Sequence, residues 1–442
     1  MDLRIRLSMG ALALGLSCAQ AMDLRQAYEA ALAQSPNIEV AREDVKSVEE
    51  SVDMARAQLK PSLSAGVSRA MNNLQQHSVD VFGQQTSGAR RYFSYNKAIT
   101  LRQRVLNLPS WHKLEQAKYR VDDAHAVLQY RQDGLASDVA TAYFAVLLSR
   151  DQVEQTQADL RFFEGQLQQA QKTFAAGVGT KTDVDEARAR LDMGRVKLLA
   201  AQEGLAYNVQ SLQAMMDDAV GDLLALDVQA MRHGVQEDHS AQDWVDWAFQ
   251  RSPEVKALSA RVDIARQEAQ AIDTGRYPTL DLIAQLSHSG SENVTSVDSS
   301  YRNRQIQLQL NVPIYSGGYQ SAAERQAAAG VRKALEQLDA LKRDLRLRVL
   351  KAHKTVLEGL ARIQAFETAV ASSQSALYST TKSFEAGLRN RIDILNARSQ
   401  LAQAQRNLSE ARYDYVTAYI QLNVLSGADM PALIDRLNVW LH

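Results

Sequence analysis

Hydrophobic and polar residues alternate in four stretches of the chain, most clearly at Leu280, Leu282, Ala284 and Leu286. A period of two is typical of a β-strand with one apolar face. The predicted strands lie near 62–68, 99–105, 280–286 and 306–312, and polar loops at 72–91 and 287–300 separate the two strands of each pair.

Elsewhere the apolar residues are spaced by three and four, which predicts amphipathic helices. The helix that follows Pro109 meets no further proline up to residue 175 and would be about 100 Å long. Helices of this length exceed those of ordinary globular domains and indicate coiled coils. Gly177 and Gly387 interrupt the pattern, so each long helix should return as an antiparallel hairpin. The predicted helices are 23–58, 110–175, 182–216, 319–385 and 391–424.

The chain also contains an internal duplication. Pro61-Ser-Leu matches Pro278-Thr-Leu, and a Phe-x-Ala-Gly sequence that begins at Phe174 recurs at Phe384. A repeat of this length predicts two equivalent halves rather than a solenoid. The predicted organisation is a signal peptide at 1–21, a first repeat at 22–216, a connecting segment at 217–240, a second repeat at 241–424 and a C-terminal segment at 425–442.

The N-terminal residues predict export. Arg4 and Arg6 precede an apolar stretch at 11–16, and Ala19-Gln20-Ala21 forms a small-residue cleavage site, so the mature chain would begin at Met22. A lipoprotein start at Cys18, the one cysteine, is the alternative. Cleavage after Ala21 would leave a mature chain without a disulfide or a cysteine-based metal site.

Composition argues against several classes of function. The net charge is −1, with 50 basic and 51 acidic residues interspersed, which gives no support for a nucleic-acid partner. We find no phosphate-binding Gly-Lys-Ser/Thr loop, no nucleophile motif and no metal-ligand spacing, so we expect neither an enzyme nor a cofactor.

Membrane entry would have to occur through the strands. The most apolar stretch after the signal, 139–148, falls far short of the roughly 20 residues that a spanning helix needs. Four strands are too few for a membrane barrel, and open sheet edges in lipid are costly, so several chains would share one barrel. A sheet outside the membrane on a coiled-coil stalk is the alternative.

Three longer motifs, together with the two hairpin tips, resemble the TolC family of outer-membrane efflux and type I secretion proteins. The motifs are Tyr277-Pro-Thr-Leu-Asp-Leu282, Leu310-Asn-Val-Pro-Ile-Tyr-Ser-Gly-Gly318 and Asn407-Leu-Ser-Glu-Ala-Arg-Tyr-Asp-Tyr415. The resemblance implies a mainly α fold with a β part. Long antiparallel coiled-coil helices would form a periplasmic tube, and four strands per chain would enter a shared transmembrane β-barrel of twelve strands in a homotrimer.

The resemblance also implies partners and a function. A periplasmic adaptor and an inner-membrane transporter of ABC type would deliver substrate to a passive duct held in outer-membrane lipid. Within the family, the chain is most similar to ducts of type I protein secretion that export proteases. A multidrug efflux duct is the first alternative, and a periplasmic coiled-coil scaffold without a pore is the second.

The tip of the second hairpin carries the candidate gate. In the family, the matching positions close the periplasmic entrance. The resemblance implies that Arg389 pairs with Thr182 and Asp183 of a neighbouring hairpin, and that Phe384 stands where a tyrosine usually contributes. Such exposed pairs contribute about 0–1 kcal/mol each, which suits a latch that a partner can open. Ordinary solvated charges are the alternative.

A second candidate site lies one turn further. The resemblance places Asp393 in a ring of three carboxylates on the pore axis, and Asn396 where many members have a second acidic ring. Because one acidic ring attracts cations less strongly than two rings do, we expect a weaker cation block than in family members that have both rings. A helix-surface aspartate without a pore role is the alternative. The tip residues expected to form the turns and to contact the adaptor are Gly177, Val178, Gly387 and Leu388.

Overall fold

The structure, a computed structural model, describes residues 21–79, 81–234, 239–292 and 299–442. The predicted signal peptide lies outside the described residues except for Ala21. The described chain divides into two compact units. Unit 1 takes its residues from Met1–Glu39, Tyr130–Ser252 and Arg343–His442, and unit 2 takes them from Val40–Gln129 and Pro253–Lys342.

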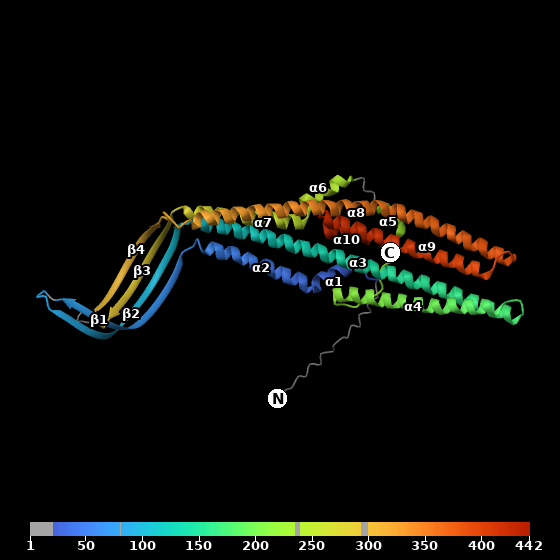
Figure 1. Cartoon of the computed structure of the whole chain (residues 1–442), viewed down its shortest axis with the longest axis horizontal. Coiled ribbons are helices and arrows are strands. Elements are labelled where there is room, and N and C mark those ends of the chain that lie inside the picture. The colour runs from blue at the N-terminus through green and yellow to red at the C-terminus, as the bar shows by residue number, and fades with distance from the viewer. Residues whose placement is uncertain (1–20, 80, 235–238, 293–298) are drawn as a thin grey trace, which may run out of the picture. The chain divides into compact units, whose positions relative to one another are not determined.

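Unit 2 contains a four-stranded antiparallel sheet whose spatial order follows the sequence, β1-β2-β3-β4 (Figure 1). The strands lie where the sequence alternation predicts them, but they are longer. Their bounds are β1 Ser62–Val79, β2 Gln85–Leu106, β3 Thr279–Ser291 and β4 Ser299–Asn311.

The predicted polar loops are therefore wrong over most of their length. The first hairpin stays paired as far as Val79 and Gln85, although 72–91 was expected to be a loop. The second stays paired as far as Ser291 and Ser299. Hydrogen bonds between the strands satisfy the backbone N–H and C=O groups whichever side chains are present. Polar residues can therefore continue a strand pair that began with an apolar alternation.

The alternation of β3 and β4 separates two faces. Leu280 pairs with Leu310 and Leu282 with Leu308, and directly paired residues share a face. The opposite face carries Asp281, whose carboxylate lies 2.6 Å from the guanidinium of Arg102 on β2. The sheet thus has an apolar face and a polar face, as the sequence pattern predicts.

The predicted first helix is divided in two at Ser35. A residue before proline avoids helical geometry, and Ser35 is extended, with ψ 111°. The same break occurs at Ser252, before Pro253. The four helices are α1 Leu24–Gln34, α2 Pro36–Ala57, α6 Ala241–Arg251 and α7 Pro253–Asp273; a short 3₁₀ turn, η1 Thr274–Arg276, follows α7.

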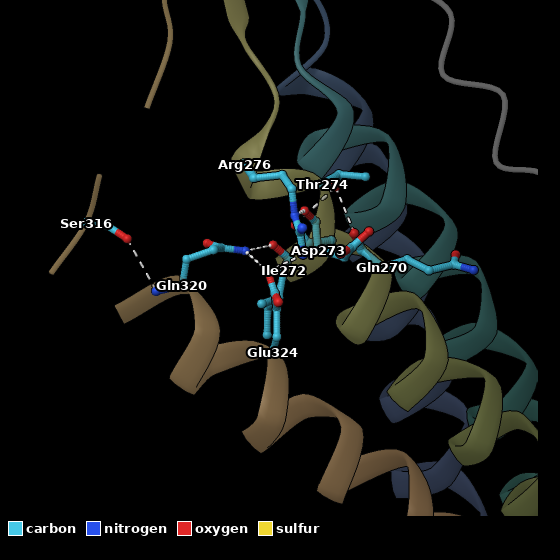
Figure 2. Close-up of polar contacts among 9 residues, drawn as sticks. Gln270, Ile272, Asp273, Thr274, Arg276, Ser316, Gln320 and Glu324 are labelled. Atoms are coloured by element: carbon cyan, nitrogen blue, oxygen red, sulfur yellow. Dashed lines mark hydrogen bonds and ion pairs between the residues drawn. The ribbon is translucent and has the colours of Figure 1, made fainter. Parts of the chain in front are cut away.

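Polar contacts hold the junction between η1 and the helix that follows β4 (Figure 2). Gln320 Nε2 donates to the carbonyl of Ile272 at 2.5 Å and to Glu324 Oε1 at 3.0 Å. The guanidinium of Arg276 lies 2.6 Å from Glu324 and 2.7 Å from Asp273. These bonds anchor the point where the chain leaves helix and enters strand.

Four long helices agree with the sequence prediction to within about two residues, the usual uncertainty of helix ends. In Figure 1, α4 returns beside α3 and α9 returns beside α8, so each pair is an antiparallel hairpin. Their bounds are α3 Leu108–Ala175, α4 Lys181–Met216, α8 Tyr319–Glu385 and α9 Arg391–Leu425.

The segments 217–240 and 425–442, which the sequence left unassigned, help to build the core of unit 1. They contain α5 Val228–Gly234 and α10 Met430–Asn438, and Leu226 forms a bridge with Leu441. The hydroxyl of Tyr143 donates to the carbonyls of Met22 (2.9 Å) and Leu224 (3.2 Å). A buried tyrosine satisfied in this way ties three distant segments together.

Candidate functional site

The two hairpin tips have the same backbone geometry. Gly177 and Gly387 have φ of 75° and 76°, a region that side chains with a Cβ rarely adopt. At the first tip, Val178 N donates to the Thr173 carbonyl and Gly177 N to that of Phe174. The second tip repeats both bonds, so both helices end in a Schellman motif. Both glycines are therefore turn residues.

Each returning helix begins with a capping box. Asp183 N donates to Thr180 Oγ1 (3.1 Å), and Thr180 N donates back to Asp183 Oδ2 (3.0 Å). Asn390 and Asp393 repeat this arrangement at the start of α9. Hydrogen bonds from Thr180 lower the pKa of Asp183. Both acidic candidates therefore have a structural role that the sequence reasoning missed, although Thr180-x-x-Asp183 matches a capping-box pattern.

Of the remaining latch candidates, Thr182 and Arg389 are exposed at the tips and Phe384 is half-buried. Arg389 Nη1 lies 3.7 Å from Asp393 Oδ2 of the same tip. The guanidinium of Arg391 lies 5.6 Å from the centre of the Phe384 ring. The predicted pairing of Arg389 with Asp183 concerns a neighbouring hairpin and stays a prediction.

Arg391 is a tip residue that the sequence reasoning missed. It is 8% exposed, and its Nη1 donates to the carbonyl of Gln166 in α3 at 3.2 Å. Asn396, the second ring candidate, accepts a hydrogen bond of 3.2 Å from Arg190 in α4. The start of α9 is therefore bonded to both helices of the first hairpin.

A buried charge cluster continues this contact away from the tip. Asp159 of α3 accepts from Arg398 of α9, with the closest approach 2.7 Å, and lies 3.7 Å from Arg406. The side chains of Asp159 and Arg398 are 13% and 17% exposed. Arg398 also lies 5.3 Å from the Phe162 ring. We call Asp159, Arg398 and Arg406 the α3–α9 cluster.

Two further contacts extend the α3–α9 interface. Gln155 Nε2 donates to Ser409 Oγ at 2.9 Å, and the Tyr413 hydroxyl donates to Asp151 at 3.3 Å. Burial raises the pKa of both Asp151 and Tyr413. From Arg391 to Arg398 the donors on α9 are seven residues apart, which is the coiled-coil repeat. That spacing was the available sequence signal for this interface.

Comparison with known proteins identifies the family. The family model described as "Outer membrane efflux protein" matches residues 27–217 and 244–428, most of the chain. The chain belongs to the outer membrane efflux protein family. The predicted resemblance is thereby confirmed.

Relatives and solved structures agree with this assignment. The chain is 28% identical over 435 residues to the proteases secretion protein PrtF of Dickeya chrysanthemi, covering 98% of this chain and 94% of PrtF. It is 30% identical to the alkaline protease secretion protein AprF of Pseudomonas aeruginosa, covering 92% and 85%. The crystal structure of CusC superposes with a TM-score of 0.80 at 17% identity, covering 92% of each chain.

As a member of this family, the chain is an outer-membrane channel protein. Its strands belong to a shared transmembrane barrel, and its long helices belong to a periplasmic tube. The predicted fold class and location are confirmed. In the described part of the chain, no helix has both the length and the hydropathy needed to cross a bilayer. The family to which the chain belongs is one of outer-membrane efflux channels. The gate roles of the tip residues stay predictions.

Proposed function

We propose that the chain is the outer-membrane exit duct of a type I secretion system that exports proteins. The observation that carries the proposal is the open four-stranded sheet with an exposed apolar face, because β1 and β4 each leave an edge that needs a partner strand in lipid. Three copies would close a barrel of twelve strands. The similarity to PrtF and AprF, both named for protease secretion, supports a protein substrate.

The partners follow from the passive nature of such a duct. A periplasmic adaptor would join the homotrimer to an inner-membrane transporter of ABC type, which supplies the energy. The alternative substrate class is small molecules, which the word "efflux" in the family description favours. A deletion strain distinguishes the two. Lost protein secretion with normal dye retention supports the proposal, and normal secretion with increased dye retention contradicts it.

We infer that the duct is built from two repeats, 22–216 and 241–424, joined by 217–240 and completed by 425–442. The recurrence of two helices, two strands and a helical hairpin in the element order supports this division. The two separate matches of the family model support it as well. Expression of the two repeats as separate chains tests it. Failure of the two chains to reconstitute a channel would contradict equivalent folding units.

We propose that Arg389 forms the periplasmic latch with Thr182 and Asp183 of a neighbouring hairpin, beside Phe384. All four lie at the tips, and exposed ion pairs of about 0–1 kcal/mol suit a reversible closure. Arg389→Ala should raise single-channel conductance. The control is Lys382→Ala, which breaks an exposed pair with Glu385 on the same tip. Equal conductance in the two variants would contradict the latch.

We propose that Asp393 forms the acidic ring on the pore axis, with the uncharged Asn396 one turn on. The capping role of Asp393 makes Asp393→Asn the sharper test, because an amide can still accept the bond from Asn390 N. This variant should abolish block by a trivalent cation, and Asn396→Asp should strengthen it. Block that is unchanged in both variants would refute the ring.

We propose that the tips contact the adaptor through the exposed residues beside the turn glycines Gly177 and Gly387. Val178 and Leu388 are 83% and 80% exposed at equivalent positions of the two tips. Val178→Asp with Leu388→Asp should abolish co-purification with the adaptor. Leu199→Asp, at an exposed site on the shaft of α4, is the control and should retain it.

A further inference from the structure

The four strands carry a charge imbalance that the composition of the whole chain hides. The chain has a net charge of −1, yet the strands contain eight lysines and arginines and one carboxylate, Asp281. That carboxylate forms an ion pair with Arg102 on the polar face of the sheet. The eight basic residues are Arg69, Arg90, Arg91, Lys97, Arg102, Arg104, Arg302 and Arg304.

Strand register places four cationic or titratable groups together on the apolar face. Lys97 of β2 pairs with His288 of β3, and His288 pairs with Arg302 of β4, so the three form one row across the sheet. Arg304 lies in the next row, opposite Leu286. We call Lys97, His288, Arg302 and Arg304 the basic row.

The basic row lies at one end of the apolar band. Arg302 is eight residues from Leu310, which is about 27 Å along a strand and about 20 Å in height at the tilt of membrane barrels. The apolar band of a membrane barrel is about 25 Å tall. The helices join the strands at the Leu310 end, so the basic row lies at the level of the headgroups in the leaflet away from the periplasm.

Aromatic contacts support an interfacial position. The ring of Tyr95 meets that of His288 edge-on at 5.5 Å, and Lys97 Nζ lies 5.9 Å from the Tyr95 ring centre. Tyr95 lies across Gly290, where a Cβ would come within 2.5 Å of the ring. Girdles of aromatic residues mark membrane interfaces in barrels. Tyr92 and Tyr301, which the alternation places on the polar face, do not belong to this girdle.

The basic row also borders a groove of about 490 Å³, which is floored by small and apolar residues of β1, β2 and β3 such as Ala65, Ile99 and Leu286. Within the described residues, no carboxylate pairs with Lys97, Arg302 or Arg304. A ligand for this groove therefore needs an anionic head and an apolar body. Each lysine or arginine at a membrane surface attracts anionic lipid appreciably.

We propose that the basic row binds the phosphate groups of lipid headgroups in the outer leaflet of the outer membrane. The apolar rows below would contact the acyl chains, and the cations would neutralise the phosphates. This site rests on the membrane position of the sheet and is independent of which substrate the duct carries. It would fix the height of the barrel in the membrane.

The test compares two double variants of the full-length, assembled protein. Lys97→Gln with Arg302→Gln removes two charges from the basic row. Arg90→Gln with Arg104→Gln removes two charges from the opposite face and is the matched control. The probe is lipid A bearing two phosphates, titrated into detergent micelles, with phosphatidylcholine as the neutral lipid. Bound lipid is counted by native mass spectrometry.

We expect binding of the diphosphorylated lipid to weaken about 5-fold for each cation removed, hence about 25-fold in the basic-row variant. The control should bind the diphosphorylated lipid as the unaltered chain does. Phosphatidylcholine should bind equally to the unaltered chain and to both variants. Equal weakening in both variants would overturn the proposal, since it would indicate general charge attraction. Displacement by millimolar inorganic phosphate would overturn it too, because it would indicate a small-anion site. Unchanged channel conductance in the basic-row variant verifies folding and shows that the duct itself is intact.

Discussion

The α3–α9 cluster gives a quantitative prediction about the stability of the contact between α3 and α9. Asp159→Asn removes the carboxylate that pairs with both Arg398 and Arg406. Exposed ion pairs contribute about 0–1 kcal/mol, whereas breaking a buried pair costs about 3–5 kcal/mol. Because the Asp159 and Arg398 side chains remain slightly exposed, we expect the local opening free energy to fall by about 2–3 kcal/mol.

Hydrogen exchange of the assembled protein measures this opening. A fall of that size should accelerate exchange about 30- to 150-fold for amides of α3 and α9 that flank the cluster. Amides in α10, away from the cluster, should not change. The matched control is Asp192→Asn in α4, whose pair with Arg195 is exposed on both sides and should cost less than about 0.5 kcal/mol.

The reasoning would be refuted if Asp159→Asn and Asp192→Asn accelerated exchange equally. A further variant separates charge from packing. Replacing Asp159, Arg398 and Arg406 together by leucine or methionine leaves no unpaired charge. It should restore most of the protection, because buried ion pairs are often replaceable by apolar residues of similar volume.

Three further changes should have smaller effects, each read from local hydrogen exchange. Gly177→Ala should destabilise its turn by about 1–2 kcal/mol because φ is positive, whereas Gly165→Ala inside α3, where a Cβ meets nothing, should stabilise by about 0.5–1 kcal/mol. Hydrogen bonds from the Thr180 side chain and backbone lower the pKa of Asp183, so the cap of α4 should hold above pH about 4 and weaken as pH falls through that lowered pKa. Thr180→Ala should reduce this dependence, because only the backbone bond remains. Burial raises the pKa of Asp151, so its charge should destabilise α3 increasingly as pH rises through that pKa, and Asp151→Asn should flatten the profile. Local stability should rise with pH at the Asp183 cap and fall with pH at Asp151, and a change of the same sign at both sites would contradict one of the two assignments.

The sequence determined the features that depend on neighbours along the chain. The long stretch without proline after Pro109 fixed α3, and the positions of Gly177 and Gly387 fixed the two tips. The alternation at Leu280–Leu286 fixed which face of β3 is apolar. Helix periodicity, turn chemistry and strand alternation are all local, so these elements were predictable from the residues alone.

Only the tertiary structure decided the contacts between distant segments. Arg391 meets the Gln166 carbonyl and Asp159 meets Arg398 across more than two hundred residues, and residue types alone do not give such pairings. The same holds for the basic row, because its members join only when the register of three strands aligns them. Strand length was also decided non-locally. Polar residues near Val79 and Gln85 continue the ladder because the partner strand supplies their backbone hydrogen bonds, a contribution that side-chain polarity does not record.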